Sequence, residues 1–100
     1  MEVWTHGRWV VKPGREDEFV EAWRGLAERT AEEFPGAHGV LLRDRDKPNR
    51  FYSFGPWESS ETVERWRGST FFREGIGNIR ELLDDFTAHT LDPAAKIGSW

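Results

Sequence analysis

The sequence contains no cysteine among its 100 residues. This absence excludes disulfide bonds, thiolate zinc sites, iron–sulfur clusters and a cysteine nucleophile. No hydrophobic run approaches the roughly 20 residues of a membrane-spanning helix. The first residues have neither the basic start nor the apolar stretch of a signal peptide. We therefore expect a cytoplasmic protein that has no membrane partner.

Basic residues are also in short supply, with 14 Lys and Arg against 18 Asp and Glu and a net charge of −4. Nucleic acids and anionic membranes bind basic patches, so we expect no nucleic-acid partner. Aromatic residues in 50–54 faintly resemble the base-stacking strands of RNA-binding domains, but the accompanying glycine–aromatic pattern is missing. Motifs for nucleotide binding, serine hydrolysis and zinc proteolysis are absent as well.

Large aromatic rings are abundant, with six Trp and seven Phe but a single Tyr. In so short a chain they indicate a thick core, an aromatic pocket, an oligomer interface, or all three. The length fits a single domain over 1–100. We expect its core to span about residues 3–91, with a C-terminal tail at 93–100.

The order of predicted elements defines a fold class. Strand-like composition and alternation occur in four segments: 3–11, 37–43, 50–57 and 86–91. Helical spacing of apolar residues occurs in three: 15–34, a short helix that begins at Ser59 or Ser60 and ends at Trp66, and a stretch around 72–83 that Gly75 and Gly77 weaken. Counted with the last two helical segments as one, the order is β-α-β-β-α-β. This is the order of an α+β, ferredoxin-like fold with one antiparallel sheet.

In this fold the helices cover one face of the sheet, and the first and last strands are neighbours. The uncovered face would expose Trp4, Tyr52 and Phe54 to water. Such an apolar face on a small domain predicts pairing with a second copy. We therefore expect a homodimer.

Four short motifs follow one another along the chain: V-K-P-G at 11–14, F-P-G at 34–36, W-E-S at 57–59 and F-R-E-G at 72–75. In this order they resemble the antibiotic biosynthesis monooxygenase (ABM) family. The resemblance implies a dimeric α/β barrel in which two sheets pack face to face. It also implies oxygenation of a hydrophobic aromatic or quinol-like small molecule without metal, flavin or other cofactor.

The sequence departs from the known catalytic sets of this family. Heme-degrading members have an asparagine where this chain has Gly7 and an iron-binding histidine where it has Ile76, so we expect no heme degradation. Anthrone oxygenases have an asparagine at the position of Ser53 and a tyrosine at that of Val63. These departures leave an alternative open, in which the protein is a non-catalytic homodimer of the same fold that binds a small molecule or a partner.

The resemblance also suggests substrate-binding residues. Trp57 matches the family tryptophan that lines the pocket. With it we expect a hydrophobic cavity between sheet and helices that is formed by Trp57, Phe51, Ser53, Trp9, Trp66 and Phe72. The alternative is that these rings belong to an ordinary core.

Proton removal from the substrate needs a base, and histidine is the natural one near neutral pH. Strand alternation directs His6 to the dimer face and leaves His89 as a candidate for the cavity. Two further candidates are Asn78, as a hydrogen-bond donor, and Arg80, as a counterpart of the family's pocket arginine. The histidine spacing is not that of a metal site, so we expect no metal.

Overall fold

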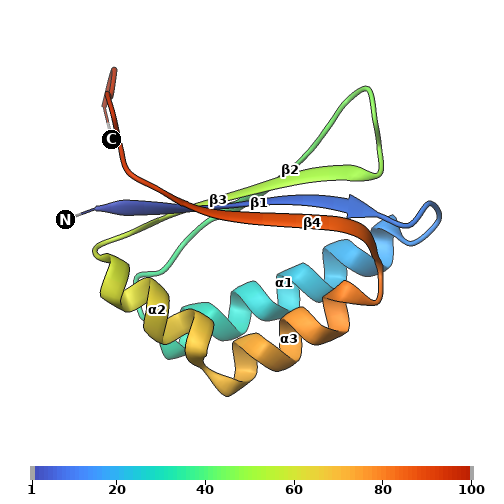
Figure 1. The fold of residues 1–100 in the computed structure, drawn as a ribbon, viewed down its shortest axis with the longest axis horizontal. Helices are drawn as coiled ribbons and strands as arrows, with labels where there is room; N and C mark the ends of the chain where they lie inside the picture. The colour runs from blue at the N-terminus through green and yellow to red at the C-terminus, as the bar shows by residue number, and fades with distance from the viewer. Residues whose placement is uncertain (1, 100) are drawn as a thin grey trace.

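The structure, a computed structural model, describes residues 2–99. Its elements are β1 (Val3–Val11), α1 (Glu16–Glu33), β2 (Val40–Arg43), β3 (Arg50–Trp57), α2 (Ser60–Gly68), α3 (Thr70–Arg80) and β4 (Leu83–Leu91). The four strands form one antiparallel sheet in the order β2-β3-β1-β4, and all three helices lie against the same face of it (Figure 1). This confirms the α+β, ferredoxin-like fold and the pairing of the first and last strands. No helix within residues 2–99 has the length and apolar character to cross a bilayer.

Two strands differ in length from their predicted ranges. β2 begins at Val40 instead of residue 37, and β4 begins at Leu83 instead of residue 86. Leu83 pairs with Val11 across a register shift in β1, and the preceding Leu82 carbonyl accepts a 2.8 Å hydrogen bond from the Lys12 N–H. This irregular pairing extends β4 over residues whose spacing alone indicated a helix.

A single serine separates the second and third helices. The backbone of Ser69 is extended, its hydroxyl lies 2.6 Å from the Trp66 carbonyl, and its Oγ accepts from the N–H of Phe72. Ser69 therefore ends α2 and begins α3, as expected from the preference for serine at helix starts.

One of the two glycines in α3, Gly75, is required for close packing, and the other, Gly77, is not. A Cβ on Gly75 would lie 2.9 Å from Leu26 Cδ1 of α1, whereas a Cβ on Gly77 would meet nothing within 4 Å. Gly75 therefore allows α3 to approach α1 closely. The sequence alone indicated only that this glycine weakens the helix, not that it serves packing.

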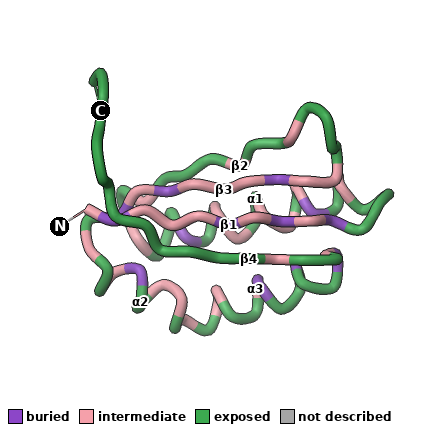
Figure 2. The backbone as a smooth tube through the Cα atoms, turned by 45° about the horizontal axis from the view of Figure 1, so that its top comes forward, coloured by how far each residue is buried: buried purple, intermediate pink, exposed green. Residues whose placement is uncertain are grey.

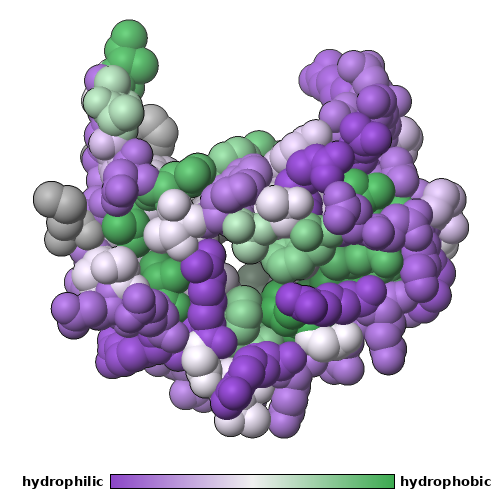
Figure 3. Space-filling view, viewed as in Figure 1, coloured by the Kyte–Doolittle hydropathy of each residue, from purple (hydrophilic) through white to green (hydrophobic). Residues whose placement is uncertain are grey.

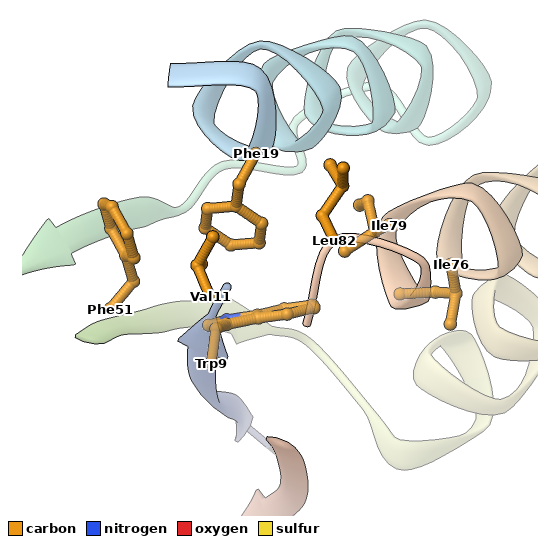
Figure 4. Packing of buried hydrophobic residues seen from close by; sticks show 7 residues of the cluster. All are labelled: Trp9, Val11, Phe19, Phe51, Ile76, Ile79 and Leu82. Carbon is orange, nitrogen blue, oxygen red and sulfur yellow. The ribbon is translucent and has the colours of Figure 1, made fainter. Parts of the chain in front are cut away.

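The buried core consists of two clusters. The larger contains Trp9, Val11, Phe19, Phe51, Ile76, Ile79 and Leu82 (Figure 4). The smaller contains Val3, Trp57 and Val63. Figure 2 shows the buried residues on β1, β3 and the helices, while β4 is exposed along most of its length. The space between the two clusters is the candidate site.

Candidate functional site

A cavity of about 120 Å³ lies between the sheet and the helices, bordered by members of both core clusters. Its position follows from the strand register. Across the inner face of the sheet, a row of large residues at Trp9, Phe51 and Phe86 is followed by a row of small ones at Gly7, Ser53 and Ala88. The next row contains Thr5 and Gly55, and the one after it Val3 and Trp57. Two rows of small side chains between rows of large ones leave the floor of the cavity open.

The helices form the opposite wall. α1 contributes Trp23, Leu26, Ala27 and Thr30, α2 contributes Trp66 and Arg67, and α3 contributes Phe72 and Ile76. Most of these side chains are apolar, as in typical small-molecule sites. Figure 3 shows this side of the molecule hollowed near its centre, between the sheet and the helices.

Each of three indole N–H groups at the cavity donates to a hydroxyl oxygen. Trp9 donates to Ser53 over 3.0 Å, Trp57 to Thr5 over 3.2 Å, and Trp66 to Thr30 over 2.9 Å, as the three Nε1–Oγ distances show. Among residues 2–99 no buried side-chain nitrogen or oxygen lacks a partner. The rings are therefore held in place by hydrogen bonds as well as by packing.

The three hydroxyls differ in whether their own O–H groups have a hydrogen-bond acceptor. Thr5 donates to the carbonyl of Gly55 over 3.4 Å, and Thr30 donates to the carbonyl of Leu26 over 2.8 Å. Within the described residues, no such acceptor is present for Ser53. Its hydroxyl can therefore donate a hydrogen bond to an oxygen atom of a ligand while it accepts one from Trp9.

Aromatic contacts fix the orientation of the rings at one end of the cavity. The ring centroids of Trp57 and Trp66 are 4.8 Å apart, and those of Trp66 and Phe72 are 4.5 Å apart with an interplanar angle of 62°. Phe34 meets Trp57 edge-on at 5.9 Å. Contacts of this kind stabilise a fixed arrangement of rings, so the wall is rigid where a planar ligand would stack.

The structure brings together five of the six predicted substrate-binding residues: Trp9, Ser53, Trp57, Trp66 and Phe72. Phe51 is not among the cavity residues, although Trp9 and Phe86 of the same row are. It is 2 % exposed and packs against Phe19, with ring centroids 4.9 Å apart. The core interpretation therefore applies to Phe51.

None of the three candidate catalytic residues borders the cavity. His89 pairs in register with His6, so its side chain is on the open face, where the two rings stack at 5.8 Å. Asn78 is exposed on α3, and Arg80 lies over the ring of Phe86 at 5.9 Å. Within residues 2–99 no group of three His, Asp or Glu side chains is arranged to hold a metal ion.

The fold changes the acidity of His6. Burial, and after it the charge of the neighbouring His89, lowers the pKa of His6. Its ring also packs against Phe54, at 4.9 Å between centroids. His6 thus lies on the open face, as strand alternation predicts.

Sequence reasoning missed Arg67 and Thr30 at the cavity. Helical spacing in the sequence indicates the inward position of both residues. Arg67 follows the buried Val63 by four residues, and Thr30 follows Leu26 by four, so each lies on the inner face of its helix.

The family of the chain is established by its sequence. Residues 3–77 match the family model described as antibiotic biosynthesis monooxygenase, abbreviated ABM, and the chain belongs to this family. No functionally curated protein matches it.

Solved structures share the fold. SnoaB from Streptomyces nogalater, described as a cofactor-independent oxygenase, is 23% identical over 98% of both chains, with a TM-score of 0.87. Rv0793 from Mycobacterium tuberculosis is 18% identical over 98% of this chain and 100% of its own, with a TM-score of 0.83. A conserved protein from Methanosarcina mazei is 18% identical over 90% of both chains, with a TM-score of 0.81.

Proposed function

We propose that the protein is a cofactor-independent monooxygenase of a hydrophobic aromatic or quinol-like small molecule, of the kind made in polyketide or other secondary metabolism. The observation that carries the proposal is the apolar, tryptophan-lined cavity inside the chain of an ABM family member. The description of SnoaB as a cofactor-independent oxygenase supports it. The cysteine-free sequence suits a cytoplasmic location.

Oxygenation without a cofactor requires a substrate that reduces dioxygen itself. An activated methylene group beside a phenol or enol loses a proton, and the resulting anion transfers electrons to O₂. One oxygen atom replaces the two hydrogens of the methylene carbon as a carbonyl, and the other leaves with those hydrogens as water. The four electrons that the carbon loses are those that dioxygen gains, so no outside reductant is needed.

The protein's part in this reaction is to bind and orient the substrate and to exclude water. Trp57 and Trp66 supply aromatic surface for stacking, and the Ser53 hydroxyl can donate to the substrate oxygen on which negative charge develops. At about 120 Å³ the cavity is close in size to the ~150 Å³ cavity known to hold benzene, and it is open on one side. It thus offers room for about one ring, and the rest of a larger substrate extends through the opening.

The proposal includes a homodimer formed through the open face of the sheet. The register places Trp4, Tyr52 and Phe54 on this face together with Val40, Leu42 and Leu91, which are 45%, 49% and 42% exposed. A contiguous apolar surface of this kind favours association. Figure 1 shows the β2–β3 connection and the chain after β4 rising on this same side of the sheet, where they would flank a second copy.

A specific observation favours a second function, that of a non-catalytic binding protein with the same fold. The hydrogen-bonding groups on the floor and helical wall of the cavity are indoles and hydroxyls, none of which is a base at neutral pH. The histidines at its border are His6, whose ring packs against Phe54 on the open face, and His38, which precedes β2. Ser53 and Val63 also replace the asparagine and tyrosine of the anthrone oxygenases. Such a protein would hold the aromatic molecule without oxidising it.

One experiment separates the two functions. Oxygen uptake with anthrone or dithranol is measured in the presence of a metal chelator, and binding is followed by tryptophan fluorescence. A monooxygenase accelerates uptake above the buffer rate, and Ala88→Leu, which fills the cavity floor, abolishes both binding and acceleration while circular dichroism stays unchanged. Binding without acceleration indicates the second function. Absence of both contradicts the proposal that this cavity takes an aromatic ligand.

A further inference from the structure

Arg67 spans the gap between α2 and the edge strand β4. Its Nη1 donates a 2.7 Å hydrogen bond to the hydroxyl of Thr90, and its Nη2 donates a 3.4 Å hydrogen bond to the carbonyl of His89. The residue is half-buried and borders the cavity together with Ala88 and Phe72. The guanidinium is therefore anchored beside the exposed strand, at an edge of the cavity.

The charge of Arg67 is not balanced by the protein. Four of the other ten arginines pair with carboxylates: Arg8 with Asp85, Arg15 with Glu18, Arg24 with Glu21 and Arg29 with Glu33. Within residues 2–99 no carboxylate lies within the 4.0 Å of an ion pair to Arg67, and both of its acceptors are neutral. Burial lowers its pKa. A half-buried cation without a counterion costs free energy, which an anionic ligand would offset.

The guanidinium also retains unused donors. Its two hydrogen bonds, to Thr90 and to the His89 carbonyl, leave further N–H groups of the planar fork available. Arginine is well suited to bind oxyanions in this way, because its donors match two oxygen atoms at once. The rest of the cavity lining is mostly apolar, and among the described residues that border it Arg67 is the only arginine or lysine. A carboxylate or phenolate of a ligand would therefore find its cationic partner at Arg67.

We propose that Arg67 is the anion-binding residue of the cavity, and that the natural ligand is a planar aromatic molecule with an anionic oxygen, a carboxylate or phenolate, at the end that faces β4. This inference rests on the proposed function, in which the cavity takes an aromatic ligand. One ring occupies the cavity beside Trp57 and Trp66, and the anionic oxygen lies at the guanidinium. For an oxidisable phenol, the same contact would stabilise the anion that reacts with dioxygen.

A purely structural role for Arg67 makes a different prediction. If the side chain serves only to tie α2 to β4, its loss weakens the binding of charged and neutral ligands alike, because the wall of the cavity moves. If it binds the anion, its loss weakens only the charged ligand. A pair of ligands with the same shape and different charge therefore distinguishes the two roles.

The test uses 2-naphthoate and its neutral analogue 2-naphthamide, with affinities for the full chain measured by tryptophan fluorescence at pH 7.5. We expect the wild type to bind naphthoate about tenfold or more tightly than naphthamide, since a hydrogen bond to a charged group has this magnitude. Arg67→Gln should remove this preference and leave the naphthamide affinity within about twofold. Arg67→Lys should retain part of it. The control Arg73→Gln removes the same charge from an exposed position on α3 and should change neither affinity.

The outcomes that contradict the inference are specific. A wild type that binds both ligands equally well overturns the assignment of Arg67 without any variant, and so does an Arg67→Gln protein that retains the preference or loses both affinities equally. In these cases the binding of naphthamide by the wild type still supports the cavity. If the wild type binds neither ligand, the proposed function fails together with the inference. Should Arg67→Gln not fold, the preference of the wild type for naphthoate and its partial retention in Arg67→Lys test the assignment of Arg67 instead.

Discussion

The indole of Trp9 and the hydroxyl of Ser53 form a 3.0 Å hydrogen bond that joins β1 to β3 on the floor of the cavity. The bond passes directly over Gly7. A Cβ at this position would lie 2.7 Å from both Trp9 Nε1 and Ser53 Oγ. Positions 7, 9 and 53 therefore form one unit, in which the absence of a side chain at residue 7 makes room for the hydrogen bond.

Gly7→Ala should therefore destabilise the protein. The new methyl group forces Trp9 or Ser53 to move, and overpacking of this kind costs about 1–3 kcal/mol. The matched control is Gly77→Ala in α3, where a Cβ meets nothing within 4 Å and where helix propensity favours alanine by up to about 1 kcal/mol. Urea unfolding followed by fluorescence should thus give changes of opposite sign for the two variants. A Gly7→Ala protein as stable as the wild type would contradict this account of the cavity floor.

Trp57→Phe tests whether the ring belongs to a binding surface or only to the core. The substitution removes the N–H that donates to Thr5, so we expect a loss of unfolding free energy of about 1 kcal/mol. Stacking contributes about 0.5–1.5 kcal/mol to an aromatic contact, so the affinity for naphthamide should also fall several-fold.

The matched control for Trp57→Phe is Phe51→Leu, which changes a buried ring outside the cavity. It should lower the melting temperature and leave the affinity of the folded protein unchanged. If Trp57→Phe behaves in the same way as Phe51→Leu, Trp57 is core and its assignment to the site is wrong.

Much of the fold could be predicted because its signals are local. Alternation places Val3, Trp9 and Trp57 on the inner face and Trp4 and His6 on the outer one, and each position agrees with the pairing of the strands. Ser59 accepts from the backbone N–H of Thr62 and so begins α2, as its side-chain chemistry predicts.

The candidate site was less predictable because it depends on contacts between distant segments. Gly7, Ser53 and Ala88 form a row of small residues only in the register that the sheet adopts, and a shift by one residue would turn each to the other face. Arg67 reaches Thr90 across the gap between a helix and an edge strand, a contact without a local signature. Phe51 shares the inner face with Ser53, but its ring packs against Phe19 in the core, a contact that strand alternation does not reveal.

The open face of the sheet leads to a prediction about assembly. Trp4→Asp introduces a charge among the apolar side chains of this face and should weaken or abolish the dimer. Glu28→Lys, on the exposed side of α1, also changes the charge and should leave the dimer intact. Light scattering at micromolar concentration should give twice the 11.7 kDa chain mass for the wild type and the Glu28 variant. A stable wild-type monomer at these concentrations would exclude the proposed dimer.

The stack of His6 and His89 on the same face should make stability depend on pH. His6 packs against Phe54 and His89, with Tyr52 at 6.4 Å between ring centroids and the Arg8–Asp85 ion pair further along the same face. Burial and the nearby His89 lower the pKa of His6 below its ordinary value of 6.5. The folded protein therefore binds this proton less readily than the unfolded chain does.

The sign of the effect follows from this difference in proton binding. Well above pH 6.5 neither state holds the proton, and His6 costs the fold nothing. As the pH falls through this value the unfolded chain takes up the proton first, so the free energy of unfolding decreases toward acid pH. Urea unfolding at a fixed protein concentration, between about pH 7.5 and pH 5.5, measures the slope. His6→Gln should flatten it, whereas His38→Gln, which removes an imidazole near Gly36 away from the stack, should not. Equal slopes for the wild type and His6→Gln would show that this histidine does not carry the pH dependence.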